Sequence, residues 1–170
     1  FAMNPLFQTL DSDLFARAQT LLDEDWLAGD ADLAPVLPTV LARGVGQDWH
    51  KAGTFRHHLV GVARSLALWQ QPREVRLLGL LHSVYGHASV ELAKVDPARE
   101  RARLRGVAGA EAEELVFLFC QRPRAQFVQR VLECAIAADG SVLLQDASGE
   151  HRLTAHQVAA FIVVSMADTI

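Results

Sequence analysis

Hydrophobic side chains recur every three or four residues along most of the chain, a period that is typical of amphipathic helices. Prolines and glycines separate the periodic segments and mark where helices begin or end. We therefore predict helices over Pro5–Leu27 with a break near Asp11, Leu33–Leu41, Thr54–Trp69, Pro72–Val84, Ala110–Gln121, Arg124–Ala138, and from Thr154 to Asp168. The predicted fold class is all-α, a bundle of helices.

One stretch breaks the helical period. An apolar run at Val142–Leu144 is followed by a turn-forming Asp-Ala-Ser-Gly sequence, after which come His151 and Leu153. This pattern predicts one short β-hairpin near residues 141–153. A second stretch, Asp96–Gly106, is strongly polar, and we predict a connecting segment there.

The composition is that of one globular domain. About half of the residues are hydrophobic (51%) and about a fifth are charged (21%). We expect a single domain over residues 3–170 and leave out Phe1 and Ala2, because Met3 is a natural start.

Charge and hydropathy argue against two classes of partner. The formal net charge is −4 and the basic residues are spread along the sequence, so we expect no nucleic-acid partner. No apolar run approaches the roughly 18 to 20 residues that a membrane span needs, so we expect no membrane partner and a cytoplasmic location. Monomer and homodimer both stay open.

Two pairs of residues have a structural explanation. Cys120 and Cys134 lie in apolar helical stretches and form no C-x-x-C motif, which predicts two small core residues in a reducing compartment. Glu113 and Glu114 lie near the start of the helix from Ala110, where negative charge interacts favourably with the helix dipole. We assign neither pair a functional role.

Two polar residues stand in strongly apolar surroundings. His82 directly follows two leucines, and Asp168 ends an apolar helix. A buried polar group that lacks a hydrogen bond costs about 1 to 3 kcal/mol. Each of these side chains therefore needs a polar partner or a metal ion.

Three short motifs stand in order along the chain. They are His58-x-x-x-Val62-Ala63, Leu80-Leu81-His82-Ser83-Val84 and Ala167-Asp168. Together they resemble the HD metalloprotein superfamily, whose pattern reads H-x-x-x-V-A, then L-L-H-D-I-G, then A-D. The departure is Ser83, which stands where the superfamily has the aspartate of its name.

A narrower likeness is to a branch without an assigned reaction, whose members read H-S-[I or V]-Y-G. The matching segments here are Gly53-Thr54, His58-Leu59-Val60-Gly61 and His82-Ser83-Val84-Tyr85-Gly86. This resemblance implies an HD-like helical fold and a site more than it implies an activity.

The resemblance also implies a metal site. In the superfamily, two histidines and two aspartates hold one or two divalent ions, and a serine hydroxyl is a poor replacement for a carboxylate ligand. We therefore expect one divalent metal ion (Fe, Mn or Zn), with His58, His82 and Asp168 as its ligands and with coordination positions left open.

Three further residues near these motifs are candidate catalytic groups: His50, Tyr85 and His87. A histidine near a metal ion is able to donate a proton or to bind substrate, because its pKa is close to neutral. Loop polarity and ordinary packing explain the same residues without any catalytic role.

Two classes of function follow. The first is a metal-dependent enzyme acting on a small organic substrate, either a hydrolase or a non-haem iron oxygenase, since a two-histidine, one-carboxylate set serves both chemistries. The second is a non-catalytic HD-like scaffold that binds a ligand or a protein after losing its second metal, as Ser83 suggests. Metal content distinguishes the two.

Overall fold

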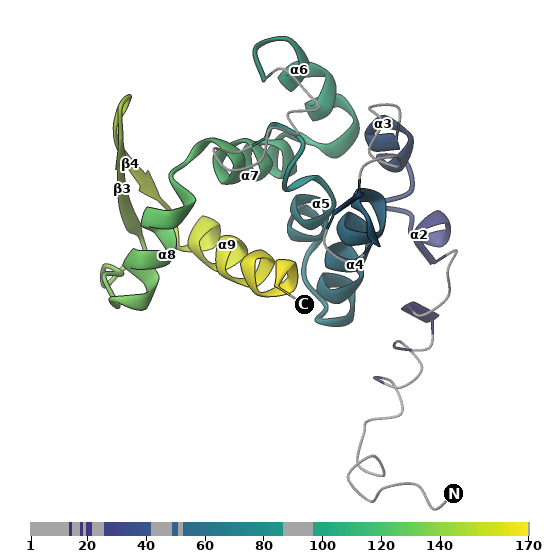
Figure 1. Ribbon diagram of the computed structural model, residues 1–170, viewed down its shortest axis with the longest axis horizontal. Coiled ribbons are helices and arrows are strands. Elements are labelled where there is room, and N and C mark those ends of the chain that lie inside the picture. The colour runs from purple at the N-terminus through teal and green to yellow at the C-terminus, as the bar shows by residue number, and fades with distance from the viewer. Residues whose placement is uncertain are drawn as a thin grey trace, which may run out of the picture.

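The computed structural model describes residues 26–41, 49–50, 53–86 and 97–169, together with positions 14, 18, 20 and 21. This part of the chain is mostly helical with two short antiparallel strand pairs, which confirms the predicted all-α fold class (Figure 1). The elements are α2 (Trp26–Gly29), α3 (Leu37–Leu41), β1 (Trp49–His50), β2 (Gly53–Thr54), α4 (Phe55–Leu68), α5 (Arg73–Leu81), α6 (Pro97–Ala108), α7 (Ala110–Gln121), α8 (Arg124–Leu132), β3 (Val142–Asp146), β4 (Gly149–Leu153) and α9 (Ala155–Asp168). The helix predicted over Pro5–Leu27 lies largely outside the described residues.

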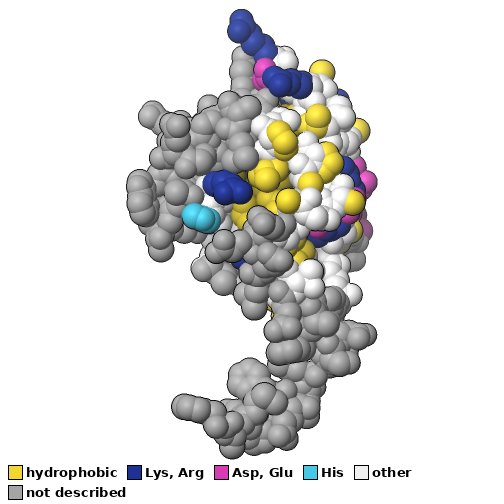
Figure 2. Space-filling model, turned by 90° about the vertical axis from the view of Figure 1, so that its right-hand side faces the viewer, with side chains coloured by type: hydrophobic (Ala, Val, Ile, Leu, Met, Phe, Trp, Pro, Cys, Tyr) yellow, Lys and Arg dark blue, Asp and Glu magenta, His cyan; other side chains and the backbone are white. Residues whose placement is uncertain are grey.

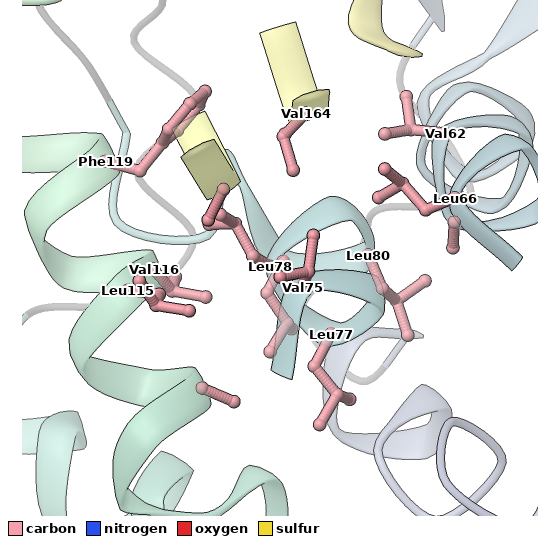
Figure 3. Close-up of a cluster of buried hydrophobic side chains, with 14 of the residues drawn as sticks. Val62, Leu66, Val75, Leu77, Leu78, Leu80, Leu115, Val116, Phe119 and Val164 are labelled. Atoms are coloured by element: carbon pink, nitrogen blue, oxygen red, sulfur yellow. The ribbon is translucent and has the colours of Figure 1, made fainter. Parts of the chain in front are cut away.

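Helix α5 is the centre of the core. Helices α4, α7 and α9 all pack against it, so the run Leu77–Leu81 is buried on every side. Figure 3 shows part of this core, with side chains from all four helices: Val62, Leu66, Val75, Leu77, Leu78, Leu80, Leu115, Val116, Phe119 and Val164. None of the helices in the described residues is long and apolar enough to span a membrane.

Helices α4 and α5 form a tight helical hairpin. Gln70 adopts a left-handed φ of 56°, and the backbone N–H of Gln71 donates to the Leu66 carbonyl, which closes the end of α4 in a Schellman motif. Gly79 allows the two helices to approach closely, because a Cβ there would clash with Leu66 and lie 3.2 Å from Val62 Cγ1. The start of α4 therefore lies beside the end of α5.

The hairpin β3–β4 has the predicted position. Val142 pairs with Leu153 and Asp146 pairs with Gly149. Thr154 then begins α9 with a capping box, in which its side chain accepts from the Gln157 N–H and the Gln157 side chain accepts from the Thr154 N–H. The predicted cap is confirmed.

Helix α6 stands where we expected a connecting segment, so that prediction was wrong. Among the side chains of this helix that the structure describes, residues 98–108, only Leu104 and Ala108 are buried hydrophobic residues, which leaves almost no apolar period to detect. Arginine, glutamate and alanine nevertheless favour a helix, and Pro97 occupies its first position, where proline is accepted. The outer face is solvated, and Figure 2 shows basic side chains projecting at the top of the molecule, where α6 lies in Figure 1.

Three predicted helix boundaries were too wide. Helix α3 begins at Leu37 rather than Leu33, and α5 ends at Leu81. Helix α8 ends at Leu132 because Cys134 adopts a φ of 54° and the Ala135 N–H bonds back to the Arg130 carbonyl, a second Schellman motif.

The two cysteines accordingly differ. Cys134 is exposed beyond the end of α8, so its predicted place in the core was wrong, whereas Cys120 is buried on α7 as expected.

Candidate metal centre

Three helices bring the predicted ligands together. His58 lies in the first turn of α4, and His82 is the C-cap residue directly after α5, so the helical hairpin places both imidazoles at the same end. Asp168 is the last residue of α9, which packs against α4 and α5 (Figure 1). Within the described residues, these three side chains form a group able to hold a metal ion.

The spacing of the three donor atoms is that of a coordination polyhedron. His58 Nε2 lies 3.3 Å from His82 Nε2, and Asp168 Oδ1 lies 3.0 Å from His58 Nε2 and 3.6 Å from His82 Nε2. Ligand atoms about 2.1 Å from a divalent ion are about 3.0 Å apart in an octahedron and about 3.4 Å apart in a tetrahedron. The donors therefore need little movement to surround an ion.

The side chain of His82 is oriented by its own helix. Its Nδ1 lies 2.7 Å from the Gly79 carbonyl oxygen, which accepts a hydrogen bond and so assigns the ring proton to Nδ1. Burial lowers the pKa of His82 to about 4, against the opposing effect of Asp168. The imidazole is therefore neutral at pH 7, and its Nε2 lone pair points at His58 and Asp168.

The two oxygens of Asp168 have different partners. Oδ1 faces the imidazoles, while Oδ2 accepts a hydrogen bond from Arg124 Nη2 at 2.7 Å. Burial alone would raise the pKa of Asp168, but the hydrogen bond from His58, the positive charge that His82 gains in acid and the contact with Arg124 outweigh it and hold the pKa below its usual range. Asp168 is therefore a carboxylate with one oxygen directed at the imidazoles.

The candidate catalytic residues do not share one environment. Tyr85 is buried, and its hydroxyl donates to Glu113 Oε1 at 2.8 Å, so the described contact of this side chain is structural. The backbone of His50 belongs to β1, where it pairs with Gly53, but its side chain lies outside the description, as does the whole of His87. Catalytic roles for these three residues stay predictions.

Sequence reasoning missed the environment of Glu113. This side chain is fully buried, and besides Tyr85 it accepts hydrogen bonds from Arg101 Nε and Nη2 and from Arg105 Nε, at 2.6 to 2.9 Å. The helix dipole alone was thus an incomplete explanation. The available signal was the spacing of Arg101 and Arg105, four residues apart and therefore on one face of a helix, in a segment where we had not predicted a helix.

Two other polar groupings are weaker candidates for a site. Glu74, Glu111 and His156 lie near one another, but Glu111 and His156 are well exposed. A second grouping, Asp146, Ser148 and His151, has the composition of a catalytic triad, yet the same His151 Nε2 lies 2.9 Å from both Ser148 Oγ and Asp146 Oδ1. A triad requires opposite ring nitrogens, so this cluster only stabilises the hairpin turn.

Comparison with known proteins identifies a family. A family model described as a domain of unknown function, DUF6817, matches residues 39–124, half of the chain. The chain belongs to the DUF6817 family. No curated protein and no solved structure matches it. The DUF6817 region includes His58, His82 and Glu113, whereas Asp168 comes from α9, outside that region.

Proposed function

We propose that this DUF6817 protein is a metal-dependent enzyme that acts on a small organic substrate at a mononuclear centre formed by His58, His82 and Asp168. The observation that supports the proposal is the mutual spacing of three donor atoms from three helices, 3.0 to 3.6 Å. The resemblance to the HD superfamily, stated on the same residues, favours the same ligand set.

The donor set fits a divalent ion of the iron, manganese or zinc type. Two imidazole nitrogens and one carboxylate oxygen are ligands for these ions, and three protein ligands leave positions for water and substrate. An ion held there supplies Lewis acidity for hydrolysis or, if it is iron, redox chemistry with oxygen. His58 and His82 hold the ion through nitrogen, and Asp168 holds it through Oδ1.

We place this activity in the cytoplasm. Both cysteines are free thiols, and Cys134 is exposed. An exposed free thiol fits a reducing compartment better than an oxidising one.

The test is the metal content of the purified protein, followed by titration of the metal-free protein with Mn²⁺, Zn²⁺ or, without oxygen, Fe²⁺. We expect one ion per chain in the wild type and none in His82→Ala or Asp168→Asn. His57→Ala is the matched control, since His57 is the exposed neighbour of His58 on α4 and the variant should bind metal normally.

The identity of the ion decides between the reactions. Iron or manganese directs the search to oxygen consumption, and zinc directs it to hydrolysis. A wild-type protein that contains no metal and takes up none would overturn the proposal and favour the non-catalytic scaffold.

A further inference from the structure

Arg124 occupies a position where a cation is not expected. It is the first residue of α8, and the positive end of a helix dipole disfavours a basic side chain there by about 0.3 to 1 kcal/mol. The guanidinium reaches across to α9, where Nη2 donates to Asp168 Oδ2 at 2.7 Å. The contact with Asp168 offsets the unfavourable location.

An aromatic side chain supports the guanidinium. Arg124 Cζ lies 4.9 Å from the centre of the Phe119 ring, within the range of a cation–π contact. The same ring meets His82 edge-on at 6.2 Å and Phe161 at 5.1 Å between centroids. Phe119 therefore contacts both Arg124 and His82, and Arg124 in turn holds Asp168.

This arrangement gives the two carboxylate oxygens of Asp168 different roles. Oδ1 faces His58 and His82, and Oδ2 is occupied by a charge-assisted hydrogen bond. A carboxylate without such a partner is able to bind an ion through both oxygens. With Oδ2 occupied, only one oxygen is offered.

We propose that Arg124 is a positioning residue that restricts Asp168 to one-oxygen ligation and so keeps a coordination position open for water or substrate. The inference rests on the proposed metal centre. The positive charge of Arg124 should lower the affinity of the site for the ion. Its hydrogen bond to Asp168 should keep one coordination position of the ion open.

The test is Mn²⁺ binding to Arg124→Met, measured as affinity and as the proton relaxivity of water, which reports the water molecules on the bound ion. We expect the ion to lose one bound water, because Oδ2 takes its place, and to bind about tenfold more tightly, because a positive charge has been removed nearby. Arg124→Lys retains a cation able to donate to Oδ2, so both values should return toward those of the wild type.

Arg122→Met is the matched control. Arg122 lies two residues earlier and donates to Asp146 Oδ2 at 3.0 Å, so this variant also loses one arginine and one ion pair. We expect wild-type relaxivity and affinity for it.

If Arg124→Met binds Mn²⁺ with unchanged or weaker affinity and keeps every bound water, Arg124 is merely a structural link between α8 and α9. If Arg124→Met does not fold, Arg124→Lys is the deciding variant. We expect its relaxivity and Mn²⁺ affinity to be close to those of the wild type, and values far from these would overturn the inference. Failure of the proposed metal centre is a separate result, seen as absence of Mn²⁺ binding in the wild type and in Arg122→Met.

Discussion

Two carboxylates in this protein have opposite surroundings. Glu113 is enclosed by donors only, the Tyr85 hydroxyl and the guanidinium groups of Arg101 and Arg105. Asp168 meets one arginine on Oδ2, but its Oδ1 faces two imidazoles. One of these imidazoles, that of His82, presents a lone pair rather than a proton.

The difference distinguishes a structural cluster from a candidate site. The Glu113 cluster is complete with its own side chains, since donors and acceptors match. In the Asp168 cluster His58 Nε2 faces two acceptors, His82 Nε2 and Asp168 Oδ1, and a cation would replace the proton that His58 shares with them. Buried charge alone does not indicate function; the balance of donors and acceptors around it is more informative.

The largest expected effect is on the free energy of unfolding, which should respond differently when each of the two carboxylates is replaced. Glu113→Gln removes the charge that compensates two arginines, so we expect a loss of about 3 kcal/mol in the free energy of unfolding, measured with urea in the presence of chelator. Asp168→Asn should cost less, about 1 to 2 kcal/mol under the same conditions, because it leaves one partly exposed arginine without its charged partner rather than two. Glu114→Gln is the control, because Glu114 binds the same arginines while being 42% exposed, and its loss should also stay below about 1 kcal/mol. Equal losses for Glu113→Gln and Asp168→Asn would contradict this distinction.

A second prediction uses the close approach of α4 and α5. Gly79→Ala should lower the free energy of unfolding by about 1 to 3 kcal/mol, because the new methyl group clashes with Leu66. It should also weaken Mn²⁺ binding, since separating the helices separates His58 from His82. Gly61→Ala on α4 meets nothing within 4 Å, so stability should stay equal or rise by up to about 1 kcal/mol. Unchanged Mn²⁺ affinity in Gly79→Ala would show that the helix spacing does not control the site.

A third prediction concerns pH. Burial alone would raise the pKa of Glu113, but hydrogen bonds from Arg101, Tyr85 and Arg105 outweigh it and lower the pKa below 4.5. Because the folded pKa is the lower one, the stability contributed by Glu113 is complete above about pH 4.5 and is lost as the pH falls through the folded pKa.

Urea unfolding of the wild type and of Glu113→Gln between pH 7 and pH 3 measures this effect. The difference between the two proteins should be constant near neutrality and should shrink in acid. Other titrating groups are present in both proteins and largely cancel. A difference that does not change with pH would disprove the assignment.

The smallest effect is a labelling rate. Burial raises the pKa of the Cys120 thiol to about 12, and its Sγ donates to the His82 carbonyl at 3.1 Å, whereas Cys134 is exposed. Iodoacetamide should modify Cys134 readily and Cys120 only after denaturation, as followed by mass spectrometry. Mn²⁺ should slow the labelling of Cys120 further without changing Cys134. Rapid labelling of both would mean that the core around His82 opens often.

The sequence predicted the candidate site better than it predicted some elements. His58, His82 and Asp168 stand on strongly periodic helices, and the structure brings all three together, although metal binding itself stays a prediction. The hydrogen-bonded environment of Glu113 was not predicted, because its arginine partners lie on α6, a helix with little apolar period. The end of α8 was not predicted either. The residue with the left-handed φ is Cys134 rather than a glycine, so the sequence gives no sign of it.

The positions of the three ligands along the chain determine when they come together during folding. His58 and His82 lie 24 residues apart at the start and end of consecutive helices, whereas Asp168 follows after α6, α7, α8 and the hairpin. Closing so long a loop costs entropy that only the packing of α9 repays. An ion that needs all three ligands would therefore be captured late in folding, after α9 has docked, and its retention would report that the bundle is complete.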